Sequence, residues 1–278
     1  MAMSLKEVEW LQKYIVSAHI MHNLQTLTLG QLKNTEILFW FLHRLPNLQT
    51  LTLEFCHFKR IWVPASLISC EKIGVVMQLK ELELYNLIYL EEIGFEHDPL
   101  LQRLERLVIC ECIKLTNLMS SSVSFYYLTH LQVDHCRLMR NLMTSSTAKS
   151  MVQLTTMKVS FYEMIVEIIA ENEEENVQEI EFRQLKSLEL VSLQNLTSSC
   201  NFEKCDLKFL LLENLVVREC SQMTKFSNVQ SAPNLQKVHV VVGEKDKWYW
   251  EGDLNVTLQK IVTDQVCIRV FINHNNFL

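Results

Sequence analysis

Residues 104–112, Leu104-Glu105-Arg106-Leu107-Val108-Ile109-Cys110-Glu111-Cys112, carry the pattern that decides the fold. The same spacing, Leu-x-x-Leu-x-aliphatic-x-x-Cys, returns from Leu48, Leu128 and Leu212. Looser copies start at Leu24, Leu79, Leu154, Leu185 and Leu235. Copies that recur every 23–31 residues indicate a repeat architecture, because self-similarity at a fixed period constrains the whole fold before any local feature does.

The mean spacing of about 26 residues is typical of leucine-rich repeats. Apolar and polar residues alternate in each core, as in a short strand. One repeat cannot bury its own apolar face, so the copies must stack. The sequence therefore predicts an α/β leucine-rich-repeat solenoid (horseshoe), with a parallel β-sheet on the concave face and short helices and irregular loops on the convex face. The alternative is an amphipathic α-helical repeat, for which the alternation has the wrong period.

The chain divides into three predicted segments. Residues 1–23 form an N-terminal helical or partial-repeat segment, because a capping-box pattern at Ser4–Glu7 precedes apolar residues at helical spacing. Residues 24–243 hold about nine repeats, and residues 244–278 form a C-terminal cap. Within this cap we expect the rings of Trp248 and Trp250 to cover the last repeat, and residues 265–271 to form a final strand.

Composition excludes several classes of protein. The 278 residues have a net charge of −6, which disfavours a nucleic-acid partner because phosphates demand a basic surface. There is no run of about 18 apolar residues, so no membrane span is expected. Charged residues at Lys6, Glu7 and Glu9 occupy the place of a signal peptide's apolar core. The expected location is cytoplasmic.

The cysteines and the missing motifs argue against an enzyme. Cys56, Cys112, Cys136 and Cys220 share one repeat position, where a small thiol packs behind the strand, and we expect them to be reduced. Neither Cys110–Cys112 nor Cys200–Cys205 has a second pair at zinc spacing, so no metal is predicted. The phosphate-binding, zinc-protease and nucleophile-elbow motifs are absent, and no cofactor or catalytic residue is predicted.

Four stretches resemble the C-terminal leucine-rich repeats of plant intracellular immune receptors of the coiled-coil, nucleotide-binding, leucine-rich-repeat class. They are residues 79–84 (LKELEL), 107–115 (LVICECIKL), 145–154 (SSTAKSMVQL) and 244–254 (EKDKWYWEGDL). The family often has proline after the slot cysteine, whereas this chain has Ile113, Arg137 and Ser221. The resemblance implies recognition of a protein ligand, either a pathogen effector or a guarded host protein. It also implies contacts with a nucleotide-binding switch domain, which full-length relatives have and these 278 residues lack.

A candidate partner-binding patch follows from the strand pattern. The residues that flank the second and third apolar positions of each copy face the concave side. They vary most in the central copies, which also supply Tyr and Arg, the usual anchors of interfaces. The patch comprises Glu81, Glu83, Tyr85, Arg106, His130, Gln132 and Asp134. The alternative is a solvated face without a ligand.

The acidic segment Glu171–Glu181 also has two interpretations. It is either a solvated loop on the convex or ascending side, or a docking site for a basic surface.

Two other functions remain open from the residues alone. Similar solenoids serve as the substrate-recognition part of ubiquitin-ligase F-box-type adaptors, although no F-box-like helical segment precedes Leu24. Secreted or cell-surface receptors carry such repeats too. They would need a signal peptide, paired cysteines and the Leu-x-Gly-x-Ile-Pro insertion, and none of these is found.

Overall fold

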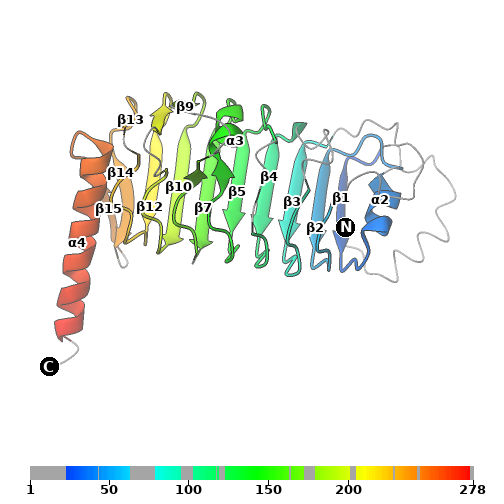
Figure 1. The fold of residues 1–278 in the computed structure, drawn as a ribbon, viewed down its shortest axis with the longest axis horizontal. Coiled ribbons are helices and arrows are strands. Elements are labelled where there is room, and N and C mark those ends of the chain that lie inside the picture. The colour runs from blue at the N-terminus through cyan, green and yellow to red at the C-terminus, as the bar shows by residue number, and fades with distance from the viewer. Residues whose placement is uncertain are drawn as a thin grey trace.

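A computed structural model of the chain describes residues 23–42, 44–62, 79–94, 103–116, 118, 123–162, 164–171, 179–200, 205–227, 229–242 and 245–275. The predicted helix after Ser4 lies outside these residues. Within them, one long sheet runs along the molecule with its strands side by side (Figure 1). This is the leucine-rich-repeat solenoid that the sequence predicts.

Each of the nine copies contributes one strand to the long sheet. The order is β1-β2-β3-β4-β5-β7-β10-β12-β14, and all neighbours in this series are parallel. The strands are β1 (Thr26–Gly30), β2 (Thr50–Glu54), β3 (Glu81–Tyr85), β4 (Arg106–Cys110), β5 (His130–Asp134), β7 (Thr156–Tyr162), β10 (Ser187–Leu193), β12 (Asn214–Arg218) and β14 (Val238–Val242).

The register of the sheet aligns equivalent residues of successive repeats. Leu82 of β3 pairs with Leu107 of β4, and Leu107 pairs with Leu131 of β5. These leucines are fully buried, as are their counterparts two residues later in each strand. Since side chains alternate across a strand, the residues between them form three rows on the opposite surface, which we call the sheet face. It is the face that the sequence predicts to be concave.

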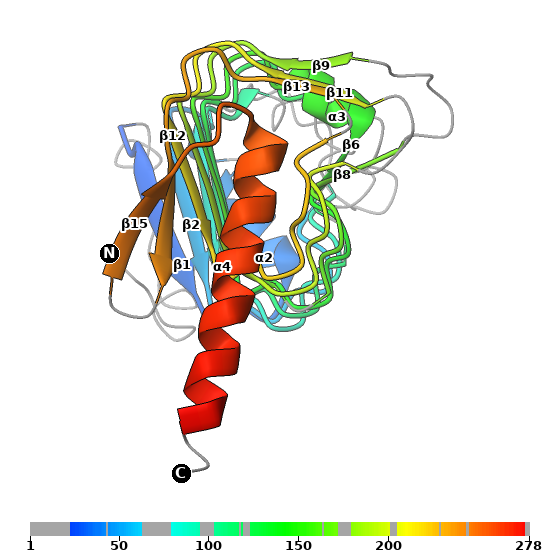
Figure 2. The same ribbon diagram turned by 90° about the vertical axis from the view of Figure 1, so that its left-hand side faces the viewer.

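The return side of the solenoid holds shorter elements. They are two helices, α2 (Thr35–Leu42) and α3 (Ser145–Ser150), a two-stranded sheet of β6 (Met143–Thr144) and β8 (Ile169–Ala170), and a three-stranded sheet of β9 (Glu179–Phe182), β11 (Asp206–Phe209) and β13 (Val229–Ser231). Viewed along the solenoid, α3, β6 and β8 lie across the core from the long sheet (Figure 2). On this side Phe182 stacks on Phe209, and Phe209 meets Phe226 edge to face, each pair with ring centroids 5.5 Å apart.

A left-handed residue lies at the end of eight of the nine long-sheet strands: in six it directly follows the strand, and in β7 and β10 it is the last residue but one. Glu111 after β4 has a φ of 58° and His135 after β5 has a φ of 52°. The Glu111 N–H donates to the Asp134 carbonyl of the next repeat at 3.0 Å, and the His135 N–H donates to Ser160 in the same way at 3.1 Å. None of the eight is glycine, although this region costs about 1–2 kcal/mol for other residues. The repeated hydrogen bond between neighbouring repeats offsets that cost.

The four slot cysteines are buried free thiols, as predicted. The Cys56 thiol donates to the Glu54 carbonyl at 3.4 Å and contacts the Leu29 carbonyl of the preceding repeat at 3.8 Å. Burial raises the pKa of Cys56 to about 11 and that of Cys220 to about 12. Cys200 and Cys205, considered above only as metal ligands, are instead joined by a disulfide next to β11, so the expectation that no cysteines are paired is wrong for these two.

The C-terminal end differs from the sequence prediction in two ways. Residues 265–271 are not a strand, because α4 (Leu254–Asn275) runs through them and across the end of the solenoid (Figure 2). Asp253 caps this helix by accepting from the Val256 N–H at 3.0 Å. The helix buries Leu254, Leu258 and Ile261, which recur at helical spacing, against the last repeat. Tertiary packing of this apolar stripe therefore overrides the β-like pattern further along.

The two tryptophans do not cover the core. Trp248 and Trp250 are 52% and 37% exposed, whereas Tyr249 between them packs against the core. The reason is β15 (Lys245–Tyr249), which pairs antiparallel with β14 and places Trp248 opposite His239 on the sheet face. One residue of register decides which side chain points inward. The Trp248 ring stacks on His239 at 4.5 Å, and the Lys237 ammonium lies 4.0 Å from its centroid.

Part of the acidic segment is a strand rather than a loop. Glu179 and Glu181 lie in β9, where Glu179 pairs with Lys208 at 2.7 Å and Glu181 pairs with Arg183 at 2.7 Å. Both contacts lie on the return side, which agrees with the placement away from the sheet face. Residues 172–178 lie outside the described part of the chain.

Candidate protein-binding face

The seven residues of the predicted patch occupy adjacent positions on β3, β4 and β5. Glu81, Arg106 and His130 are register partners in the first row of the sheet face. In the second row Gln132 and Glu83 flank Val108, and in the third row Asp134 and Tyr85 flank Cys110. All seven side chains are partly buried. The structure thus brings the predicted residues together on one surface.

Glu83 is the centre of the acidic half of the patch. Its Oε2 atom accepts from the Tyr85 hydroxyl at 3.4 Å and from the Thr52 hydroxyl at 3.5 Å. Its Oε1 atom pairs with the Nε of Arg106 at 3.4 Å. Burial, and secondarily the Glu83 charge, raises the pKa of Tyr85. These contacts orient the Tyr and Arg side chains before any ligand arrives, which lowers the entropic cost of binding.

The other half of the patch keeps unused hydrogen-bonding capacity. Within the described chain, the His130 imidazole and the Gln132 amide have no side-chain hydrogen bond. Burial, and secondarily the Arg106 charge, lowers the pKa of His130, which therefore stays neutral at physiological pH. A neutral imidazole and an amide each offer a donor and an acceptor, so this half can bind polar groups of either kind.

Asp134 closes the patch on the side of β7. It accepts from the Ser160 hydroxyl at 2.7 Å, and its Oδ1 atom lies 3.0 Å from the Nδ1 of His135. The second contact is close enough for an ion pair with protonated His135, yet its angle does not satisfy a hydrogen bond and leaves that nitrogen unpartnered. The His135 ring stacks on Phe161 at 4.4 Å, and Phe161 is 40% exposed. The partly exposed Phe161 ring is therefore an apolar neighbour of the patch next to Asp134.

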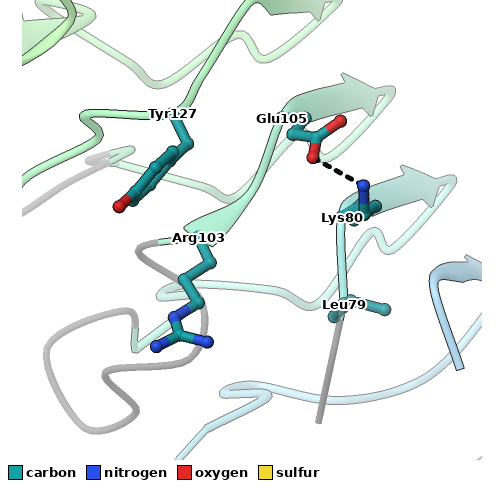
Figure 3. A pocket seen from close by; sticks show the side chains of 5 residues that line it. All are labelled: Leu79, Lys80, Arg103, Glu105 and Tyr127. Carbon is teal, nitrogen blue, oxygen red and sulfur yellow. Dashed lines mark ion pairs between the residues drawn. The ribbon is translucent and has the colours of Figure 1, made fainter. Parts of the chain in front are cut away.

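A pocket of about 430 Å³ opens beside the patch, where β3 and β4 begin. The described residues that line it are Leu79, Lys80, Arg103, Glu105 and Tyr127. Figure 3 shows the Glu105 carboxylate directed at the Lys80 ammonium, with Arg103 and Tyr127 on the other side. The Lys80–Glu105 ion pair measures 2.9 Å. The next residues along the two strands are Glu81 and Arg106, so pocket and patch are continuous.

The predicted patch does not include this pocket because its first row begins at Glu81, Arg106 and His130, whereas the pocket residues lie one to three positions earlier in their copies. Arg103 and Glu105 flank the buried Leu104, and this alternation marks them as outward-facing. The adjacent Tyr126 and Tyr127, 55% and 54% exposed, were a second available signal. What the sequence could not provide is that side chains from three different repeats converge here.

Comparison with known proteins gives the same repeat assignment. The family model described as plant disease resistance protein RPS2-like, leucine-rich repeats, matches residues 1–126 and 123–242. The chain belongs to this family. The two matches together span most of the chain, including every strand of the candidate patch. No curated protein and no solved structure gives a significant match.

Membership of the RPS2-like repeat family agrees with the resemblance seen in the sequence and supports a defence-related repeat module. Among the described residues, no three His, Cys, Asp or Glu side chains are grouped so that they could hold a metal ion. None of the helices in the described ranges has the length and apolar character needed to cross a bilayer.

Proposed function

We propose that this chain is a non-enzymatic protein-recognition module of a plant intracellular immune receptor. Its ligand is a protein, either a pathogen effector or a host protein that the receptor guards. The ligand binds the sheet face, centred on Glu81, Glu83, Tyr85, Arg106, His130, Gln132 and Asp134. In full-length relatives a nucleotide-binding switch domain would respond to this binding in the cytoplasm.

The observation that supports the proposal most directly is the fixed alignment of the three rows. Eight successive strands, β1 to β12 of the long sheet, are joined by paired backbone hydrogen bonds at their starts; for example, the Lys80 carbonyl accepts from the N–H groups of Glu105 and Arg106 at 2.7 and 3.0 Å. A rigid scaffold holds Tyr85 and Arg106 at the middle of an extended surface, where interface anchors contribute most. The mixture of acidic, basic and neutral polar groups favours a protein over a polyanion.

The test is a triple substitution, Tyr85→Ala, Arg106→Ala and His130→Ala, in the receptor that carries these repeats. Each replacement shortens an outward side chain without touching the apolar core, so the solenoid should fold normally. Binding is measured by a two-hybrid screen against effector and host proteins, and signalling by the cell-death response in leaves. We expect both to be lost.

A matched triple substitution controls for general effects of shortening surface side chains. Arg140→Ala, Lys149→Ala and Gln222→Ala change exposed residues away from the sheet face. This control should bind and signal as the parent does. Equal behaviour of the two triple variants would remove the patch from the proposal.

A further inference from the structure

Among the described residues that line the pocket beside the patch, one positive charge is left without a counter-charge. Lys80 and Glu105 pair at 2.9 Å and cancel each other. Arg103, the third charged side chain among these described wall residues, forms no ion pair or hydrogen bond within the described chain. In Figure 3 its side chain extends downward from the ribbon, away from the Lys80–Glu105 pair, and the Tyr127 ring lies above it. Within the described lining, an arginine without a counter-charge and an exposed tyrosine therefore border the cavity.

The pocket is held on the most regular part of the scaffold. The Glu105 carbonyl accepts from the N–H groups of Thr129 and His130 at 2.8 and 3.1 Å, and the Lys80 carbonyl accepts from those of Glu105 and Arg106 in the same way. Leu79 and Leu104, which flank this backbone, are buried in the core. The positions from which the walls project are therefore fixed before a ligand binds, which reduces the ordering cost of binding.

We infer that this pocket binds an acidic side chain, Asp or Glu, of the protein that occupies the sheet face. The inference rests on the proposed function and adds the chemistry of one contact. The guanidinium of Arg103 presents paired N–H donors that match the two oxygens of a carboxylate. The Tyr127 ring covers the aliphatic part of the bound side chain, and its hydroxyl adds a donor. Lys80 stays engaged with Glu105 and sets the far wall.

The charge balance makes the pocket selective. A basic side chain would face Arg103 without compensation, because Glu105 is already paired. A nucleic acid would bring many phosphates to a chain whose net charge is −6. A phosphorylated side chain shares the anionic chemistry of Asp and Glu, and the experiment separates these two sources.

The experiment selects a phage-displayed random dodecapeptide library on the full chain and on three variants. The charge reversal Arg103→Glu tests the pocket. The triple variant Tyr85→Ala, Arg106→Ala and His130→Ala tests the proposed function. Arg140→Glu is the matched control, since Arg140 is also exposed but follows β5 instead of preceding a strand of the long sheet.

We expect peptides selected on the parent chain and on Arg140→Glu to be enriched in Asp or Glu at one position, and those selected on Arg103→Glu to carry Lys or Arg there instead. A synthetic parent-selected peptide should then bind the chain on the order of tenfold more tightly with its Glu than with Gln at that position, as measured by fluorescence polarisation at low salt. The Glu form should lose this advantage on Arg103→Glu. A phosphoserine form that binds more tightly than the Glu form would overturn the assignment to Asp and Glu.

The two proposals fail in different ways. If the triple variant abolishes selection but Arg103→Glu still selects acidic peptides, the pocket inference is wrong and the face proposal stands. If the triple variant selects the same peptides as the parent chain, the face proposal is wrong, and so is the inference that depends on it. Selection of no peptide by the parent chain contradicts both.

Discussion

The Nε atom of Arg106 on β4 lies 3.4 Å from the Oε1 atom of Glu83 on β3, two residues further along its strand. This diagonal contact joins two rows of the sheet face across neighbouring repeats. Because Glu83 also accepts from Tyr85, the aromatic and the basic anchor of the patch share one acceptor. A substitution of Glu83 should therefore affect both Tyr85 and Arg106.

Replacing Glu83 by Gln should lower the pKa of Tyr85. Burial is the larger cause of the raised pKa and remains in the variant, but the negative charge that opposes phenolate formation is removed. The measurement is a spectrophotometric titration of tyrosine absorbance, with the Tyr85→Phe trace subtracted in each background. Glu213→Gln, at an exposed position, should leave the Tyr85 pKa unchanged. An unaltered pKa in Glu83→Gln would show that the carboxylate does not act on Tyr85.

The Cys56 thiol should make stability depend on alkaline pH. Its pKa is raised from 9.0 to about 11 in the folded chain, chiefly by burial, so the unfolded chain loses the proton first. The stabilisation by the thiol is complete below pH 9 and is lost as pH rises toward 11, at up to about 1.4 kcal/mol per pH unit. Urea unfolding at pH 8, 9 and 10 measures this loss.

Cys56→Ala separates that thiol from the other groups that titrate at alkaline pH. We expect the variant to be less stable than the parent by about 1–2 kcal/mol at pH 7, because it leaves a small cavity. Between pH 9 and 11 its stability should fall less steeply. Parallel curves for the two proteins would mean that the Cys56 pKa is ordinary.

The left-handed turns predict an unusual order of substitutions at Glu111. Its φ of 58° is accessible to glycine without strain and poorly accessible to a β-branched residue. Glu111→Val should lose about 1–2 kcal/mol of unfolding free energy, whereas Glu111→Gly should be neutral or stabilising. At Thr116, an exposed position without a positive φ, the order should reverse. Urea unfolding of the four variants measures these differences in stability. At Glu111, a Val variant as stable as the Gly variant would contradict the left-handed conformation of this residue.

Asn255 should connect α4 to the last repeat. Its Oδ1 atom accepts from the Phe226 N–H at 2.6 Å, and its Nδ2 donates to the Ser227 carbonyl at 3.0 Å. Asn255→Ala should destabilise the chain by about 1–3 kcal/mol, because it leaves the Phe226 N–H without its partner. Asn255→Asp should be intermediate, since it keeps the acceptor and loses the donor.

Thermal unfolding followed by circular dichroism measures these changes at Asn255. Gln259→Ala, on the exposed side of α4, should leave the unfolding temperature near that of the parent chain. If Asn255→Ala unfolds at the same temperature as this control, the amide contributes nothing to docking of the helix.

Much of the candidate face was predictable because it depends on two regularities of the sequence. Alternation within each strand assigns the facing of Glu83 and Gln132, and the repeat period aligns Glu81 with Arg106 and His130. The contacts among these side chains were not predictable. The hydrogen bonds of Glu83 depend on rotamers and on the lateral distance between strands, and neither is encoded in a spacing.

The sequence by itself determined that nine leucine-rich copies stack, which leucines enter the core, and which cysteines pack behind the strands. Those features follow from local periodicity and from the need of each repeat to bury an apolar side. Only the tertiary structure decided that Trp248 and Trp250 lie outward, that α4 closes the end, and that Arg103 and Tyr127 share a pocket. The last repeat has no further copy beside it to cover its apolar end. The segment that packs there is therefore decided by which apolar side chains the fold brings to that end, and not by the repeat pattern. The pocket likewise depends on the distance between side chains that the sequence separates by a full repeat.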